Sequence, residues 1–368
     1  VNKSNAKSLS HNFHSIKNCI AGALTFPSHN EVPTPSQPRQ PRNLQGLLRF
    51  AMEATKAEDA PGNSELGPMD EQRRKFLEEA LKSLTVNVAE ILQNAIKVLS
   101  DTDKMKGIQL GEELPEDVDV AFTNLLEYID DIDIANDFYK MGGFSIFPIC
   151  YGSENEEVRS RANQTLAELC QNNPFCQART LECGLLNVLL HLISSEQGSG
   201  LAKCILAISC ACREFEPACR ELISQGGCGA LAQALRASHP AARTKAAFFI
   251  RYLCNHHPDA KEKFIELNIV RTIIEQVKSS RDETSEHLLG ILLNLLETLE
   301  PAVLQQCTDP SLDLNNVLEA HLQHPDLSGD TYTEEKEYCQ EILKIIQNFP
   351  AREVVNCEAD RYMSMLLV

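Results

Sequence analysis

Apolar residues repeat with a period of 42 residues through the middle of the chain. Gly142, Gly184, Gly226 and Asn268 stand 42 residues apart, and apolar side chains follow each of them at offsets of two, five and nine. These offsets place side chains on one face of a helix. The residues at the three offsets are Phe144, Leu186, Cys228 and Val270, then Phe147, Leu189, Leu231 and Ile273, then Tyr151, Ile193, Leu235 and Val277. Glycine and asparagine tolerate positive φ, so the pattern predicts a turn between two helices at each of the four positions.

A second pattern precedes four prolines, Pro174, Pro217, Pro258 and Pro301, which are spaced 43, 41 and 43 residues apart. Mostly apolar residues stand twelve, eight and five positions before each proline, again on one helical face. They are Ala162, Ile205, Ala246 and Leu289, then Leu166, Ser209, Ile250 and Leu293, then Leu169, Cys212, Leu253 and Leu296. We expect each proline to end this helix and to redirect the chain.

A repeat of about 42 residues made of two or three helices has the armadillo/HEAT period. One such unit cannot bury its own apolar face, so successive units stack. We therefore predict an all-α fold, an armadillo/HEAT-like right-handed superhelical solenoid with N-terminal helices and a C-terminal helical cap. Four repeats are expected over 118–284, beginning at 118, 159, 201 and 243, followed by a partial repeat and capping helices over 285–349. An irregular helical bundle is the alternative.

The flanking segments have different compositions. Residues 1–41 are rich in Ser, Asn and Pro and are expected to form a disordered tail, although the apolar run 19–26 has a faint likeness to a signal-peptide core. Residues 42–69 read as a short amphipathic segment and a Pro/Gly-rich linker. Residues 70–117 are expected to form N-terminal helices, with Asp70 as an N-cap and a helix over 88–99. The tail 350–368 stays unassigned.

Charge and cysteine content narrow the classes of partner. The formal net charge of -18 argues against nucleic acid, because the protein surface and the phosphates repel each other. Apolar runs are too short to span a bilayer, so we expect no membrane association. The 14 cysteines form no CxxC pair and no zinc-finger spacing with histidine, which favours free thiols in a reducing, cytoplasmic compartment and no structural metal.

Catalytic motifs are missing as well. The sequence contains no GxxxxGK[ST], GxGxxG, GxSxG or HExxH, so we expect neither an enzyme nor a bound cofactor. Gly226 to Gly229 is better explained as a helix–helix turn than as a phosphate site. The acidic residues between 112 and 133 lack EF-hand spacing and are expected to form a solvated face.

The outward side of the helix before each proline is the candidate partner-binding surface. Aromatic residues and arginine there are the types that anchor protein interfaces. The candidates are Gln164, Glu168, Gln171, Ala207, Ala211, Glu214, Phe248, Arg251, Tyr252 and Asn255. The alternative is that Phe248 and Tyr252 pack against neighbouring helices. We expect Ile291 and Leu295 to be covered by C-terminal helices.

Several segments resemble the cytosolic 70-kDa heat shock protein-binding protein family of armadillo-type nucleotide exchange factors. They are Arg42-Asn43-Leu44-Gln45-Gly46-Leu47-Leu48, Glu71-Gln72-Arg73-Arg74 with Phe76 to Ala80, Asn136-Asp137-Phe138, Arg161-Ala162, Ala207 to Cys210, and His287 with Leu289-Gly290. The resemblance covers about 42–349. It implies a monomeric co-chaperone whose concave repeat face embraces one lobe of the ATPase domain of a 70-kDa heat shock protein and promotes ADP release. It also implies that an N-terminal segment competes with the chaperone's substrate.

Two other functions stay open at this point. One is a generic armadillo adaptor for another protein, although peptide grooves of that kind use ladders of Trp and Asn. Here the chain has no Trp and the corresponding ladder reads Glu168, Ala211, Tyr252 and Leu295. The other is the endoplasmic-reticulum relative of the same family, which would need a cleaved signal and a luminal retention tail that the sequence does not clearly show.

Overall fold

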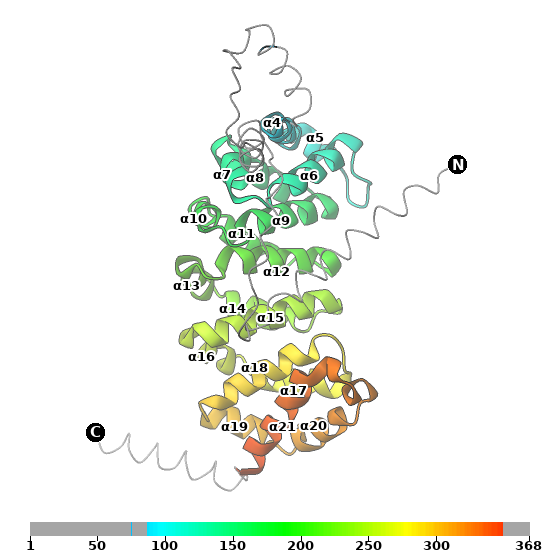
Figure 1. Ribbon diagram of the computed structural model, residues 1–368, viewed down its shortest axis with the longest axis vertical. Helices are drawn as coiled ribbons and strands as arrows, with labels where there is room; N and C mark the ends of the chain where they lie inside the picture. The colour runs from blue at the N-terminus through cyan, green and yellow to red at the C-terminus, as the bar shows by residue number, and fades with distance from the viewer. Residues whose placement is uncertain (1–74, 76–86, 349–368) are drawn as a thin grey trace, which may run out of the picture. The chain divides into compact units, whose positions relative to one another are not determined.

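The computed structural model describes Lys75 and residues 87–348, and the described residues form helices and no strand (Figure 1). The expectations for the two tails and for the amphipathic segment lie outside the described residues, and of the helix expected after Asp70 only Lys75 is described, which is helical. Within residues 87–348, the first three helices are α4 (Val88–Leu99), α5 (Thr102–Gly107) and α6 (Glu116–Tyr128). The helix predicted over 88–99 is confirmed at both ends. It begins after Asn87, whose side chain accepts a hydrogen bond from the Glu90 amide.

The following helices come in triplets. The triplets are α7 (Ile132–Lys140), α8 (Ile146–Tyr151) and α9 (Glu156–Cys170); α10 (Pro174–Glu182), α11 (Leu185–Leu192) and α12 (Gly198–Cys212); α13 (Glu216–Ser224), α14 (Gly227–Ala234) and α15 (Pro240–His256); α16 (Pro258–Glu266), α17 (Ile269–Ser279) and α18 (Ser285–Glu297); and α19 (Pro301–Cys307), α20 (Leu314–Leu322) and α21 (Thr333–Asn348). Short 3-10 helices η1 (Gly143–Ser145), η2 (Pro325–Ser328) and η3 (Asp330–Tyr332) lie between them. The triplets have the predicted period but begin at other residues than the predicted units.

Turns inside the triplets occupy the predicted positions. Gly142, Gly184, Gly226 and Asn268 precede the second-helix segments with φ of 82°, 68°, 83° and 55°. Gly227, which follows Gly226 in the third of these turns, also has to lack a side chain, because a Cβ there would lie 2.6 Å from the Leu222 side chain. The Gly226-Gly227 pair is thus a helix–helix turn, as the sequence indicated.

The role expected for the prolines is wrong in one respect. Pro174, Pro258 and Pro301 are the first residues of α10, α16 and α19, and Pro217 is the second residue of α13. The preceding helix already ends two to five residues before the proline. Proline is well tolerated in the first turn of a helix, because its missing N–H has no helical partner there and its ring already fixes φ.

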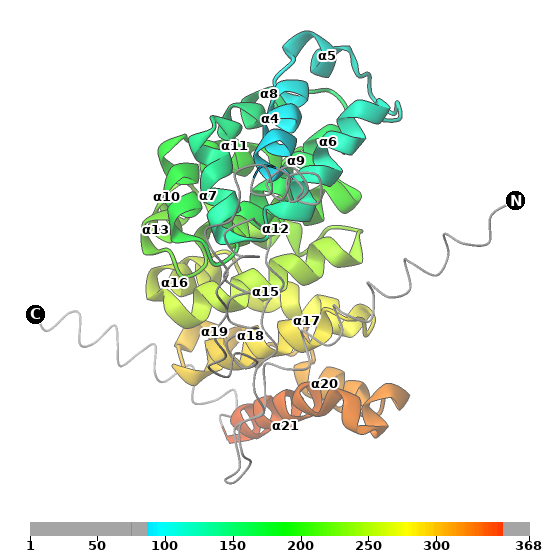
Figure 2. The same ribbon diagram turned by 45° about the horizontal axis from the view of Figure 1, so that its top comes forward.

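The third helices of the triplets form the continuous core of the described part. α9, α12, α15 and α18 contact one another in sequence, and α21 packs on α18 at the C-terminal end (Figures 1 and 2). The apolar positions predicted from both patterns point into this stack: Leu189, Ile205, Leu231, Ile250, Ile273 and Leu289 are fully buried. Burying one such side chain contributes about 1.5–3 kcal/mol. Ile291 and Leu295 are buried too, as expected for residues beneath the capping helices.

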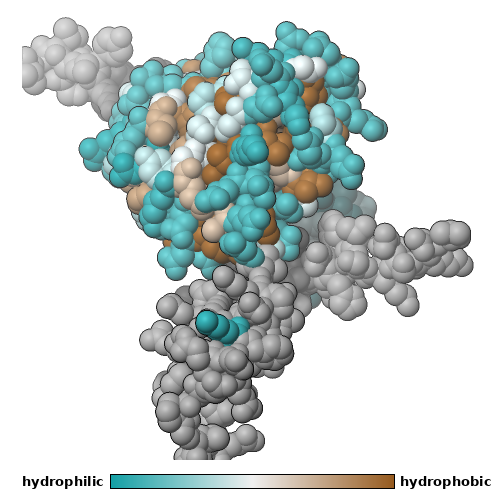
Figure 3. Space-filling model, turned by 90° about the horizontal axis from the view of Figure 1, so that it is seen from above, coloured by the Kyte–Doolittle hydropathy of each residue, from teal (hydrophilic) through white to brown (hydrophobic). Residues whose placement is uncertain are grey.

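Hydrophilic and apolar side chains alternate on the end that carries α4 (Figure 3). Leu110, Val120 and Ile132 are among the large apolar residues left exposed in this part of the chain. The twelve cysteines among the described residues are all free. In residues 87–348, no helix is long and apolar enough to cross a membrane, and no group of three or more His, Cys, Asp or Glu side chains could hold a metal ion.

Candidate protein-binding face

The outward sides of α9, α12 and α15, here called the third-helix face, carry most of the predicted partner-binding residues. Gln171, Glu214 and Asn255 are exposed, whereas Gln164, Glu168, Arg251 and Tyr252 are half-buried. Phe248 exposes 40% of its surface, which is unusual for a large aromatic residue on a packed helix.

Two of the predicted residues do not belong to this surface. Ala207 and Ala211 are 0% and 1% exposed, so their side chains are not available to a partner. α12 packs between α9 and α15, and small residues on it let the neighbouring helices approach closely. The helical spacing identified a side of α12 correctly, but it could not indicate how far the adjacent helices would cover that side.

Phe248 and Tyr252 lie beside an arginine that the sequence analysis missed. The Cζ atom of Arg213 is 4.9 Å from the Phe248 ring centroid and 5.6 Å from the Tyr252 ring centroid. The Tyr252 hydroxyl accepts a 2.7 Å hydrogen bond from the backbone N–H of Glu214. Tyr252 is therefore held by the preceding triplet, and Phe248 is left as the exposed aromatic residue. Arg213 directly follows the last residue of α12, where helical spacing gives no signal.

A hollow of about 390 Å³, here called the face hollow, opens beside Phe248. Its lining includes Gln171, Gln177, Cys210, Arg213, Glu214, Lys245 and Phe248. Gln177 fixes the floor, because its Nε2 donates hydrogen bonds of 2.8 and 2.9 Å to the carbonyls of Cys210 and Arg213. Burial raises the pKa of the Cys210 thiol to about 11, so the thiol is protonated at neutral pH and is a poor nucleophile. The hollow thus presents two cations, the carboxylate of Glu214 and an aromatic ring, and it suits binding better than covalent chemistry.

Arg251 is not free to meet a partner in the way the sequence suggested. Its Nη2 donates a 2.7 Å hydrogen bond to the Tyr338 hydroxyl of α21, and its Cζ lies 5.1 Å from the Tyr338 ring centroid. Nearby, burial and then the Arg251 charge lower the pKa of His287, whose ring lies 5.8 Å from that of Phe248. Arg251 therefore links α15 to the capping helix at the border of the third-helix face.

Comparison with known proteins identifies two adjoining matches to family models. The model described as "Nucleotide exchange factor Fes1" matches residues 44–138, and the model described as "SIL1/FES1/HPBP1 C-terminal domain" matches residues 134–246. A designed armadillo repeat protein in complex with the peptide (KR)4 has a TM-score of 0.55 at 15% identity, covering 68% of this chain and 99% of that chain. This structural likeness shows the armadillo fold and nothing more.

Two curated relatives extend the match along most of the chain. Hsp70-binding protein 1 of Mus musculus is 28% identical over 319 residues, which are 85% of this chain and 88% of that protein. Hsp70-binding protein 1 of Homo sapiens is 27% identical with the same coverage. From the two consecutive domain matches, the two relatives and the stacked helical triplets, we conclude that this chain belongs to the SIL1/FES1/HPBP1 family of nucleotide exchange factors.

Proposed function

We propose that the chain is a co-chaperone that binds the ATPase domain of a 70-kDa heat shock protein through its third-helix face and promotes ADP release. The observation that supports this face most directly is the half-exposed Phe248 beneath the Arg213 guanidinium, beside the face hollow. Aromatic residues and arginine in well-packed surroundings are the usual anchors of protein interfaces. Lys245 and Arg213 would meet polar or acidic groups of the chaperone.

Such a function needs no catalytic residue in this chain. A protein that binds the open form of a nucleotide cleft better than the closed form weakens nucleotide binding by the same factor. Accelerating release a hundredfold in this way takes about 2.7 kcal/mol of differential binding. An interface of ordinary size, about 1,600 Å², is large enough to supply that difference.

The test is a stopped-flow measurement of labelled ADP leaving a purified 70-kDa heat shock protein. The wild-type protein should accelerate release at micromolar concentration. The variant Phe248→Ala should need about a thirtyfold higher concentration for the same effect, since losing an interface anchor costs about 2 kcal/mol or more. Arg220→Ala is the matched control, because Arg220 is an exposed residue of α13 that pairs with Glu216 and lies outside the face hollow.

The possible results separate two parts of the proposal. If the wild-type protein does not accelerate ADP release, the proposed function is wrong. If the wild type is active and Phe248→Ala has the same concentration dependence, the function stands and the proposed face is wrong. We also propose that the protein acts as a cytoplasmic monomer, which imaging of a tagged full chain and light scattering would test.

A further inference from the structure

Two arginines close the edge of the stack where each second helix turns into the third. Arg159 Nη1, from the first turn of α9, donates hydrogen bonds of 2.8 and 2.9 Å to the carbonyls of Ser153 and Glu154 in the loop before that helix, and its Nε pairs with Glu196 of the loop before α12. Arg243 repeats the arrangement 84 residues later. Its Nη1 donates 3.0 Å bonds to the carbonyls of Ala237 and Ser238, and its Nη2 pairs with Asp282 of the next loop.

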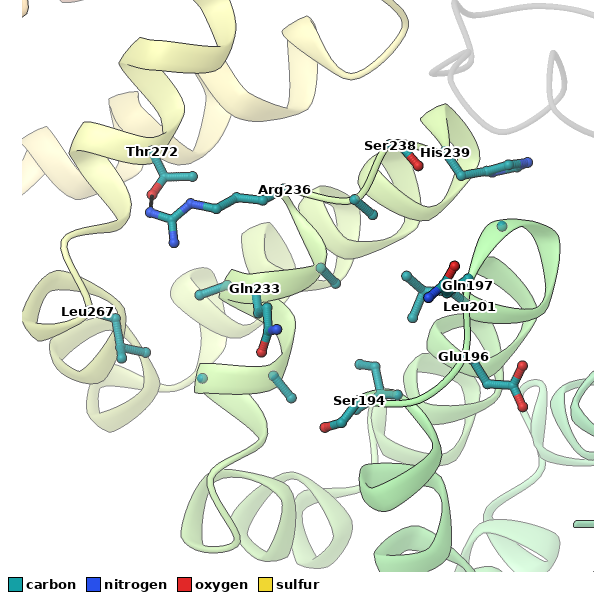
Figure 4. Close-up of a pocket in the computed structure, with 17 residues that line it drawn as sticks. Ser194, Glu196, Gln197, Leu201, Gln233, Arg236, Ser238, His239, Leu267 and Thr272 are labelled. Carbon is teal, nitrogen blue, oxygen red and sulfur yellow. Dashed lines mark hydrogen bonds between the residues drawn. The ribbon is translucent and has the colours of Figure 1, made fainter. Parts of the chain in front are cut away.

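Midway between them, the same position holds Leu201, 42 residues from each arginine. The apolar side chain of Leu201 cannot bridge the loops. The loop before α15, which faces it, contains Ser238 and His239, whereas the loops that face Arg159 and Arg243 contain the carboxylates of Glu196 and Asp282. A hollow of about 640 Å³, here called the edge hollow, opens where the bridge is missing, and Ser194, Leu201, Gln233, Arg236 and Leu267 are among the residues that line it (Figure 4). The hollow therefore coincides with a break in an otherwise repeated contact.

The charge inside the edge hollow is unbalanced. Arg236 is exposed and donates a 2.7 Å hydrogen bond to the Thr272 hydroxyl, but it pairs with no carboxylate of residues 87–348 (Figure 4). Glu196 is the single carboxylate among the lining residues, and it is buried and paired with Arg159. In a chain with a net charge of -18, an arginine without a carboxylate partner favours an anionic occupant.

Apolar surface lies next to this cation. Leu267 exposes 44% of its surface at one side of the hollow, whereas Leu201 and Ile193 on the other side are buried and expose only their edges. The amides of Gln197 and Gln233 and the hydroxyls of Ser194 and Ser238 supply further hydrogen-bonding groups. An occupant with an aliphatic side chain beside a carboxylate would match both halves of the lining.

We propose that the edge hollow binds an acidic, aliphatic segment of a protein partner, with a carboxylate on Arg236 and an aliphatic side chain against the exposed Leu267. This surface is distinct from the third-helix face: its lining shares no residue with the face hollow. A guanidinium–carboxylate pair gives the contact its charge selectivity. The protein would then hold a second polypeptide segment without using Phe248.

The probe is a fluorescein-labelled peptide of four Glu-Leu units, compared by anisotropy with a matched peptide of four Gln-Leu units. The Glu-Leu peptide should bind the full chain with a Kd on the order of 100 µM, and its affinity should fall as salt screens the pair. Arg236→Ala should weaken binding at least about fivefold, as expected for loss of a charge-assisted hydrogen bond. Arg220→Ala, which removes an equal charge elsewhere, should leave the Kd unchanged.

A second variant tests the apolar half of the lining. Leu267→Ser would remove the exposed aliphatic contact and should weaken binding of the Glu-Leu peptide, with circular dichroism checking that the chain stays folded. The proposal is overturned if Arg236→Ala binds the Glu-Leu peptide as tightly as the wild type does, or if the Gln-Leu peptide binds equally well. Absence of binding up to about 1 mM peptide would overturn it too.

Discussion

Arg251 of α15 donates a 2.7 Å hydrogen bond to the hydroxyl of Tyr338 of α21, which lies 87 residues further along the chain. The Tyr338 hydroxyl in turn donates a 3.2 Å bond to Glu334 one turn earlier on α21. This contact crosses α18, which packs between α15 and the capping helix. It fixes the C-terminal cap at the border of the third-helix face, so changes in the cap and in the face are coupled through Arg251.

Gly290→Ala should break that contact without touching either partner. A Cβ on Gly290 would lie 2.9 Å from Cζ of Arg251 and 3.0 Å from its Nε, so the guanidinium has to move away. Because alanine also stabilises a helix interior relative to glycine, losing the hydrogen bond should make Gly290→Ala less stable than the control variant by about 0.5–1.5 kcal/mol, measured by urea denaturation, and speed amide exchange in α21. The control is Gly229→Ala in α14, where the added Cβ meets nothing within 4 Å and the helix should gain about 0.5–1 kcal/mol. Equal effects of the two variants would contradict the role given to Arg251.

The adjacent phenylalanines of α15 should respond in opposite ways. Phe249 is fully buried, so Phe249→Ala should cost about 3–5 kcal/mol of stability. Phe248→Ala should lower the free energy of unfolding by only about 1–2 kcal/mol, since 40% of the residue already faces solvent, yet it should impair ADP release from the chaperone. Thermal denaturation of both variants, run beside the release assay, separates loss of fold from loss of contact. A large destabilisation by Phe248→Ala would mean that the ring is a core residue.

A buried ion pair anchors the cap and makes its stability depend on pH. Arg281 donates to both carboxylate oxygens of Glu335 at 3.1 and 2.9 Å, and His321 Nε2 donates to the same carboxylate at 2.6 Å. Burial alone would raise the pKa of Glu335, but these hydrogen bonds outweigh it and hold the pKa below its ordinary value of 4.5. The stabilisation is therefore complete above about pH 4.5 and is lost as the pH falls through the lowered pKa of the folded state.

Replacing the carboxylate tests this anchor directly. Glu335→Gln should cost about 3–5 kcal/mol at pH 7, because it leaves the buried Arg281 guanidinium without its main counter-charge, and it should flatten the acid limb of the stability curve. Asp326→Asn removes the exposed second partner of Arg281 and should cost no more than about 1 kcal/mol. Unfolding midpoints at pH 4 and pH 7 for the two variants measure the difference. Equal losses for both would show that burial of Glu335 is unimportant.

The sequence predicts those features of this structure that depend on local residue types, and it does not predict those that depend on contacts between distant helices. Glycine and asparagine every 42 residues gave the turns, because positive φ is a local demand that the residue type itself satisfies. The apolar offsets likewise predicted the buried faces of the helices, because helical spacing is also a local property of the sequence. Ala207 and Ala211 were assigned to the surface wrongly, because coverage by α9 and α15 depends on how closely helices from other triplets approach.

The partners of Arg251 and Phe248 were beyond sequence reasoning. The Arg251–Tyr338 contact spans 87 residues and depends on the path of the cap, which no repeat predicts. Arg213 was missed because it follows α12 in a turn and reaches back over Phe248 only in three dimensions. The break at Leu201, by contrast, can be read from the sequence once the repeated role of Arg159 and Arg243 is known.

Asn268 offers a last test of the repeat itself. It is the one non-glycine residue at the four equivalent turns and adopts φ of 55°, whereas Gly226 at the preceding turn has φ of 83°. Asn268→Gly should preserve or raise the free energy of unfolding, by up to about 1 kcal/mol, because glycine enters the left-handed region without steric cost. Asn268→Val should lower it by about 1–2 kcal/mol, since a β-branched residue clashes with its own backbone there. Urea denaturation of the two variants beside the wild type measures this order. If valine is tolerated as well as glycine, the 42-residue turn does not depend on its backbone conformation, and the repeat must be fixed by packing alone.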